Sequence, residues 1–176
     1  REVMAAFLSL VLFGCKDESE LDVDLTAPDC AGIRDQCFHN HDLKGVKKMN
    51  LANLVDILVS SSLFSQQDPM NSMLFGIPAK LGLGKMWKHH YALRDVVDAK
   101  IIEFWFKRKA EFESNQSQHN EPRNIIDCII NHNKKCEKAG TEKDMLQPKD
   151  IIGDVIAFLF AGLDTSAETS ITSLCY

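Results

Sequence analysis

The sequence lacks the features that mark several classes of protein. Its 20 Lys and Arg residues are outnumbered by 25 Asp and Glu residues, which gives a formal net charge of -5. Because a nucleic-acid surface requires an excess of positive charge, we expect no nucleic-acid partner. No apolar run approaches the roughly 20 residues that span a bilayer. The six cysteines include no Cys-x-x-Cys pair, and their spacings do not resemble a small disulfide framework.

Common catalytic and metal-binding motifs are also missing. There is no Gly-x-Ser-x-Gly elbow and no His-Glu-x-x-His pair, and the stretch Gly82–Lys85 lacks the rest of a phosphate loop. Zinc-type ligands do occur together, but their spacing, C-x6-C-x-H-x-H, matches no common finger, so ordinary loop residues are favoured. These ligands are Cys30, Cys37, His39 and His41.

One apolar stretch near the start, Val3 to Gly14, is followed by Cys15 and could be read as the core of a signal peptide with a lipid-acceptor cysteine. Glu2 lies where positive charge is needed, and bulky Phe13 lies where small residues are expected. A buried helix is therefore favoured, and a lipid-anchored secreted protein is retained only as a third alternative.

The residues that are present predict an all-α chain in one continuous unit. With 45% hydrophobic and 26% charged residues the composition is globular. No segment reads as a confident strand, and residues 16–26 read as an exposed helix end or loop. Gly14 and Gly140 are expected to end helices and Pro148 to begin one, with Asp150 in its first turn. From apolar periodicity, helices are expected near residues 2–14, 47–64, 86–112, 122–138 and 148–176. A long hydrophobic connector rich in Pro and Gly is expected at 66–85.

The last helix contains the most informative stretch, VIAFLFAGLDTSAET (Val155 to Thr169). Nine apolar or glycine residues precede Asp164, and a helix that is apolar all round must be buried. We therefore expect Asp164, Thr165 and Ser166 to lie beside a cavity, with Ala157, Ala161 and Thr165 on one face. The alternative is a helix that emerges into solvent at Asp164, with its hydroxyls bonded back to helix carbonyls.

The sequence Ala161-Gly162-Leu163-Asp164-Thr165-Ser166 resembles the distal-helix motif of cytochrome P-450 monooxygenases, [AG]-G-x-[DE]-T-[ST]. The order and size of the expected helices, with a hydrophobic loop between two long ones, are similar to the family's. The resemblance implies the helical part of the cytochrome P-450 fold, truncated, as one domain over residues 1–176.

The resemblance also implies roles for residues and cofactors. Ala161 and Gly162 would lie over the distal face of haem b, and Thr165 would hydrogen-bond the reacting oxygen while Asp164 supplied protons. Ala157 and Phe160 would line the substrate pocket, and residues 66–85 would form its lid. The reaction would insert one oxygen atom from O2 into a small apolar substrate. Electrons would come from NADPH through a flavoprotein reductase or a ferredoxin-type donor.

Several family motifs are absent from the chain. The iron-ligand motif F-x-x-G-x-R-x-C-x-G does not occur, since Gly32, Arg34 and Cys37 miss its spacing by one residue and lack the Phe. E-x-x-R and W-x-x-x-R are absent too. The chain starts at Arg1 and stops at Cys175-Tyr176 inside a helix, so we expect a central part of an enzyme, inactive alone. The alternative is a non-catalytic helical binding domain in which the motif is incidental.

Overall fold

The computed structural model describes residues 10–15, 18–38, 41–66, 81, 84–114 and 122–175. Only the backbone is described at residues 18, 62–66, 85–86, 163–164, 166–168 and 170–175. Helices dominate this part of the chain and its strands are two or three residues long, which confirms the predicted fold class. The chain divides into two compact units, one of Arg1–Leu21 with Ile101–Tyr176 and the other of Asp22–Lys100.

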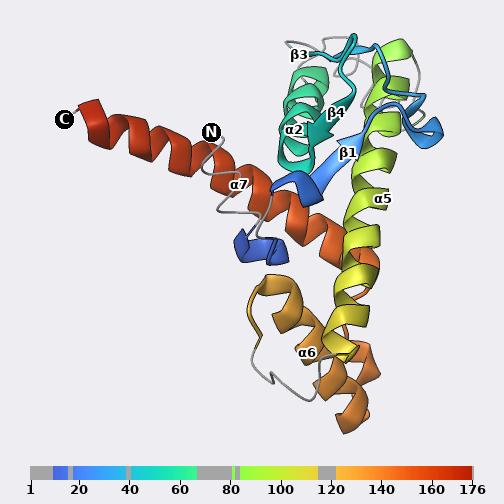
Figure 1. The fold of residues 1–176 in the computed structure, drawn as a ribbon, viewed down its shortest axis with the longest axis vertical. Helices are drawn as coiled ribbons and strands as arrows, with labels where there is room; N and C mark the ends of the chain where they lie inside the picture. The colour runs from blue at the N-terminus through green and yellow to red at the C-terminus, as the bar shows by residue number, and fades with distance from the viewer. Residues whose placement is uncertain are drawn as a thin grey trace. The chain divides into compact units, whose positions relative to one another are not determined.

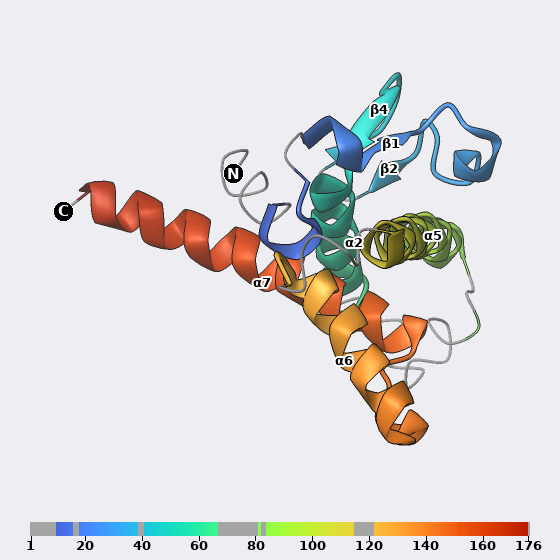
Figure 2. The same ribbon diagram turned by 60° about the horizontal axis from the view of Figure 1, so that its bottom comes forward.

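The first unit is built from helices. It begins with the helical residues 10–13 and includes the C-terminal half of a long helix shared with the second unit. Its elements are η1 (Glu18–Leu21), part of α5 (Lys85–Ser114), α6 (Ile125–Ala139), η3 (Glu142–Asp144) and α7 (Pro148–Cys175). Figures 1 and 2 show α6 leading through a short connector into α7, which is one continuous helix.

The second unit combines short strands with α2 and the first half of α5. Its elements are β1 (Asp22–Asp24), η2 (Pro28–Cys30), β2 (Cys37–Phe38), β3 (His41–Asp42), β4 (Lys48–Asn50) and α2 (Leu51–Gln66). β1 pairs antiparallel with β4, so that Val23 lies opposite Met49 (Figure 1). β2 pairs antiparallel with β3, with Phe38 opposite His41. α2 follows β4 without a linker.

The strands correct the expectation that the chain contains none. β1 lies within residues 16–26, a segment expected to be an exposed helix end or loop, although Leu21, Val23 and Leu25 are buried. A strand of three residues shows too little alternation to be recognised from its sequence. Its partner β4 also lies far along the chain, so no tight-turn signal connects the two.

The helix boundaries agree with the sequence to within a few residues. α2, α5, α6 and α7 correspond to the helices expected at 47–64, 86–112, 122–138 and 148–176. The first expected helix, 2–14, is described only from residue 10, and it ends at Gly14, whose φ is 72°. Of the expected connector 66–85, residues 67–80 and 82–83 lie outside the described part of the chain.

Two caps define α6. Asn124 precedes the helix with extended backbone, and its Oδ1 accepts a hydrogen bond from Asp127 N at 2.8 Å. The expected start at Pro122 is therefore too early. At the other end Gly140 adopts the left-handed conformation (φ 70°), and its N–H reaches the carbonyls of Cys136 and Glu137, as predicted.

The described residues contain neither a helix suited to span a membrane nor a cluster of metal ligands. None of their helices is both long and apolar enough to cross a membrane. No three of their His, Cys, Asp or Glu side chains are grouped closely enough to hold a metal ion. Of the zinc candidates, His39 lies outside the described residues, while Cys30 is buried and Cys37 is exposed.

Candidate functional site on helix α7

The sequence sets where α7 begins. Pro148 is its first residue, and Gln147 N donates to Asp150 Oδ2 at 3.1 Å, which caps the first turn. The positions of Pro148 and Asp150 in the first turn follow the sequence prediction, which did not include the hydrogen bond from Gln147 N. The side-chain cap satisfies a backbone donor that the helix itself leaves without a partner.

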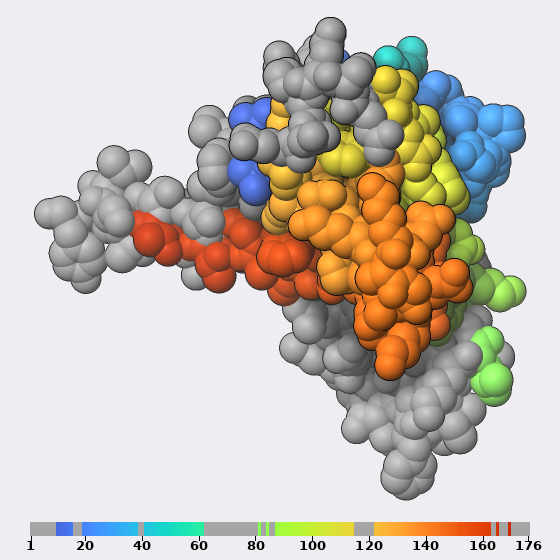
Figure 3. All heavy atoms as spheres, turned by 90° about the horizontal axis from the view of Figure 1, so that it is seen from below, coloured from blue at the N-terminus to red at the C-terminus, as the bar shows by residue number. Residues whose placement is uncertain are grey.

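α7 has one buried and one exposed face in the part whose side chains are described. The buried face repeats every four residues and consists of Ile151, Val155 and Leu159, each 1% exposed. The exposed face consists of Ala157, Phe158, Ala161 and Thr165. Figure 3 shows the described atoms of this helix in red. The helix is therefore amphipathic and not buried all round, which corrects the expectation from its apolar run.

Thr165 is exposed, and its hydroxyl is bonded to its own helix. Oγ1 donates to Ala161 O at 2.5 Å, and Thr169 Oγ1 donates to Thr165 O at 2.7 Å one turn later. The expectation that Thr165 enters buried surroundings is wrong in this structure, and the back-bonding alternative describes it. The side chains of Asp164 and Ser166 lie outside the described atoms.

The remaining sequence-predicted residues divide between the faces. Ala157 and Ala161 lie on the exposed face with Thr165, as their spacing of four requires. Phe160 and Gly162 are half-buried and lie to the side of it. Phe158, which the sequence analysis did not select, is 51% exposed and lies on that face.

The chain is thus helix-dominated, with a long helix that presents small side chains and a hydroxyl on an open face. A family model described as Cytochrome P450 matches residues 16–176. The chain therefore belongs to the cytochrome P450 family, whose members are haem-dependent monooxygenases that receive electrons from redox partners. No curated protein and no solved structure matches the chain.

The exposed face of α7 carries several small residues. Ala157 and Ala161 each present a single methyl group, and a Cβ added at Gly153 would meet no atom within 4 Å. Side chains therefore cover the backbone only thinly along Gly153, Ala157 and Ala161, although Phe158 lies beside them on the same face.

The cysteines whose side chains are described do not provide the thiolate that would bind a haem iron. Burial, followed by the charge of Glu20, raises the pKa of the Cys15 thiol to about 11, which opposes thiolate formation. Burial likewise raises the pKa of Cys30. The other cysteines whose side chains are described are Cys37, Cys128 and Cys136, all free thiols. None of these five lies in the family's iron-ligand motif.

The near-match at Gly32, Arg34 and Cys37 is a structural loop. Arg34 Nε donates to Leu25 O at 3.1 Å, and Nη2 donates to the carbonyls of Thr26 and Ala27. Gly32 packs on α5, where an added Cβ would lie 2.9 Å from the Cβ of Ala92. Nε and Nη2 of the guanidinium thus hold the loop through the chain's own carbonyls.

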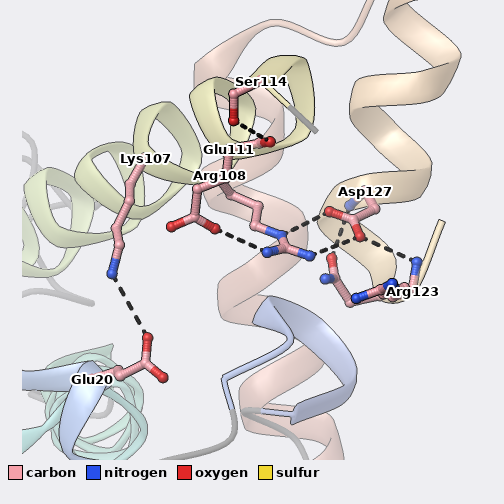
Figure 4. Close-up of polar contacts among 8 residues, drawn as sticks. Glu20, Lys107, Arg108, Glu111, Ser114, Arg123 and Asp127 are labelled. Carbon is pink, nitrogen blue, oxygen red and sulfur yellow. Dashed lines mark hydrogen bonds and ion pairs between the residues drawn. The ribbon is translucent and has the colours of Figure 1, made fainter. Parts of the chain in front are cut away.

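A polar cluster that the sequence analysis missed joins α5 to α6 (Figure 4). Arg108 donates from Nε to Asp127 Oδ1 at 2.8 Å, from Nη2 to Asp127 Oδ2 at 3.0 Å and from Nη1 to Glu111 Oε2 at 2.9 Å. The hydrogen bonds to Asp127 are the main cause that raises the pKa of Arg108. Asp127 also accepts from Arg123 N at 3.1 Å. The signal was Asn-x-x-Asp at 124–127, the pattern of a helix cap.

Gly14 lies against this cluster. A Cβ added there would lie 2.5 Å from Asn124 Nδ2, which has no hydrogen-bond partner among the described atoms. The assignment of the amide is fixed because Asn124 Oδ1 accepts from Asp127 N. Together with Cys15, Glu20 and others, Gly14 lines a small hollow in the first unit.

A second missed contact connects α2 and α5 within the second unit. Ser61 Oγ donates to Leu58 O at 2.9 Å and lies 3.2 Å from His90 Nδ1. Because the hydroxyl proton is directed to Leu58 O, we assign the tautomer in which His90 Nδ1–H donates a hydrogen bond to Ser61 Oγ. His90 is 8% exposed, and burial and then the charge of Arg94 lower its pKa.

Proposed function

We propose that this chain forms the distal wall of the haem site in a monooxygenase that oxidises a small apolar substrate. The observation that supports this most strongly is the exposed face of α7, where Ala157, Ala161 and Thr165 follow one another at four-residue spacing. The face lies within the segment that the family model matches. Haem b, when bound, supplies the activation of O2, using electrons from NADPH through a flavoprotein reductase or a ferredoxin-type donor.

In this proposal the small side chains define the closest approach. Ala161 and Gly162 hold the helix backbone near the haem, since neither has a side chain beyond one methyl group. Ala157 and Phe160 border the substrate, and their apolar surfaces exclude water from the reacting centre. An apolar lining selects apolar substrates because polar groups would lose their hydrogen bonds to water on entry.

Thr165 and Asp164 handle protons. With its own proton donated to Ala161 O, Thr165 Oγ1 presents lone pairs and accepts a hydrogen bond from a protonated group on the open face. Rotation of the hydroxyl away from Ala161 O converts it into a donor, at a cost of about 1 kcal/mol for the hydrogen bond released. Asp164, the adjacent acid, replenishes the proton from solvent.

The iron ligand belongs to a different segment in this proposal. A cysteine thiolate would hold the haem iron, and no cysteine of this sequence has the context of the family's iron-ligand motif. The cysteine is accordingly supplied by polypeptide outside these 176 residues, and the chain alone is inactive.

The experiment compares residues 1–176 with the full-length protein that contains them, each expressed with haem supplied. We expect the full-length protein to give the thiolate-type Soret band of a carbon monoxide complex and residues 1–176 to give none. The same band from residues 1–176 would refute the assignment of the ligand to another segment. Its absence from the full-length protein would favour a non-catalytic helical binding domain.

A further inference from the structure

Asn133, on α6, binds the backbone of the segment that leads into α7. Its Nδ2 donates to Leu146 O at 3.0 Å, and Leu146 N donates to its Oδ1 at 2.9 Å. One carboxamide thus satisfies both backbone groups of one residue, in the manner of a rung of a β-ladder. Leu146 lies two positions before Pro148, the first residue of α7.

The connector between the helices is fixed at further points. Thr141 N donates to Cys136 O at 2.9 Å, and Met145 N donates to Glu142 O at 3.1 Å. α6 itself is tied to α5 by the Arg108–Asp127 pair. A chain of bonds therefore runs from α5 through α6 to the last residues before α7, and Asn133 is its final side chain.

We propose that Asn133 is a positioning residue of the haem site, because its clamp on Leu146 fixes the start of α7 and thereby the placement of Ala161 and Thr165. The inference rests on the proposed function, in which these two residues face the haem. Ile151, Val155 and Leu159 decide which side of α7 is buried. Apolar packing is non-directional, however, so a hydrogen-bonded clamp is needed to fix the axial position of the helix.

Helix geometry shows how a distant clamp affects the site. At 1.5 Å per residue, Ala161 lies about 20 Å along α7 from Pro148. A tilt of about 3° at the start of a rod of that length moves its far end by roughly 1 Å. A misplacement of about 1 Å at a catalytic centre can lower the rate on the order of 100-fold. A small loosening at Leu146 is therefore sufficient to disturb a site four turns away.

The test uses the haem-loaded full-length protein with Asn133→Asp, and Asn131→Asp on the same helix as the matched control. Aspartate replaces the donor Nδ2 by a negatively charged oxygen, which Leu146 O repels. The side chain and Leu146 therefore move apart, and the hydrogen bond from Leu146 N is lost as well. Hydrogen exchange at the Leu146 amide reports the clamp. The affinity for 4-phenylimidazole, measured by the shift of the Soret band, reports the distal space independently of turnover.

We expect Asn133→Asp to raise the exchange rate at Leu146 by about tenfold, the effect of one lost hydrogen bond. We also expect it to weaken 4-phenylimidazole binding at least fivefold and to leave the carbon monoxide Soret position unchanged. Asn131→Asp should alter neither quantity. If Asn133→Asp does not accumulate, Asn133→Ser, which keeps a neutral donor and acceptor on a shorter side chain, replaces it.

Faster exchange at Leu146 with unchanged 4-phenylimidazole affinity would overturn the inference, because the clamp would then be a structural tie only. Unchanged exchange would overturn it as well. Absence of a haem spectrum from the wild-type protein would instead overturn the proposed function, and the inference with it.

Discussion

Asp127 is 2% exposed and accepts two parallel hydrogen bonds from Arg108, whose own side chain remains 24% exposed. The pair is asymmetric, since the carboxylate depends on the guanidinium for its charge balance while the guanidinium still reaches water. Asp127 caps its own helix as well, through Arg123 N. The cluster therefore ties the start of α6 to α5.

Removing Arg108 should be strongly destabilising. Arg108→Met keeps much of the side-chain volume but leaves a buried carboxylate without its partner, so the free energy of unfolding should fall by about 3 kcal/mol. Urea denaturation measures the change. Lys107→Met is the control, since its pair with Glu20 spans 3.7 Å between side chains about half exposed; it should cost less than about 1 kcal/mol. Equal losses for the two variants would contradict the account.

Gly14→Ala should destabilise the protein through backbone strain and through a steric clash with Asn124. The same substitution at Gly45 introduces the strain without the clash. Gly14 has φ 72°, and its added Cβ would lie 2.5 Å from Asn124 Nδ2. Gly45 has φ 75° and open space around its added Cβ. Gly45→Ala should therefore cost about 1 kcal/mol, from backbone strain alone, and Gly14→Ala clearly more. Similar midpoints of thermal unfolding for the two variants would show that the contact with Asn124 is unimportant.

His90 should make the stability depend on pH below neutrality. Its pKa is lowered in the folded state by burial and by Arg94, so the unfolded chain binds the proton more tightly. The free energy of unfolding should thus fall as the pH drops below about 6.5, the ordinary value for histidine, and level off below the folded pKa. Burial raises the pKa of Asp98 in the folded state. Protonation of this carboxyl group therefore increases the free energy of unfolding as the pH falls through the acidic range, which is opposite to the effect of His90.

His90→Gln provides the comparison because an amide can still donate to Ser61 but does not titrate. The difference in unfolding free energy between about pH 7.5 and 5.5 should be smaller in this variant than in the wild type. An identical pH dependence would assign the effect to other groups.

Thr165→Val should separate a catalytic from a structural role. The hydroxyl is exposed, and its hydrogen bond among the described residues is to its own helix, so its loss should change the free energy of unfolding by less than about 0.5 kcal/mol. In the full-length protein, product formation should fall roughly 100-fold, because the proposed proton transfer through the hydroxyl would be lost. Thr169→Val, one turn further on, is the matched control and should leave product formation intact. Equal product yields from both variants would exclude the proton role of Thr165.

The sequence predicted the helices well because their ends carry strong local signals. Gly14 and Gly140 adopt left-handed conformations that glycine tolerates, and Pro148 starts α7 at the position that needs no backbone donor. The strands were missed because β1 and β4 are three residues each and depend on pairing across the chain. Such pairing leaves no local pattern.

The candidate site was predicted only in part. Four-residue spacing correctly placed Ala157, Ala161 and Thr165 on one face. Its exposure could not be inferred from apolar composition, because Phe158 and the alanines lie on the open side of the helix while only every fourth residue is buried. The Asn133 clamp and the Ser61–His90 bond could not be predicted, since each joins two segments whose relative placement the sequence does not specify.

The central claim is that the Ala157–Ala161–Thr165 face of α7 borders the haem. An experimental structure of the haem-loaded full-length protein tests this most directly. We predict that Ala161 contacts the porphyrin on the side opposite the cysteine ligand, with Thr165 Oγ1 directed into the space above the iron. A haem bound elsewhere, with this face covered by protein side chains or open to water, would contradict the account.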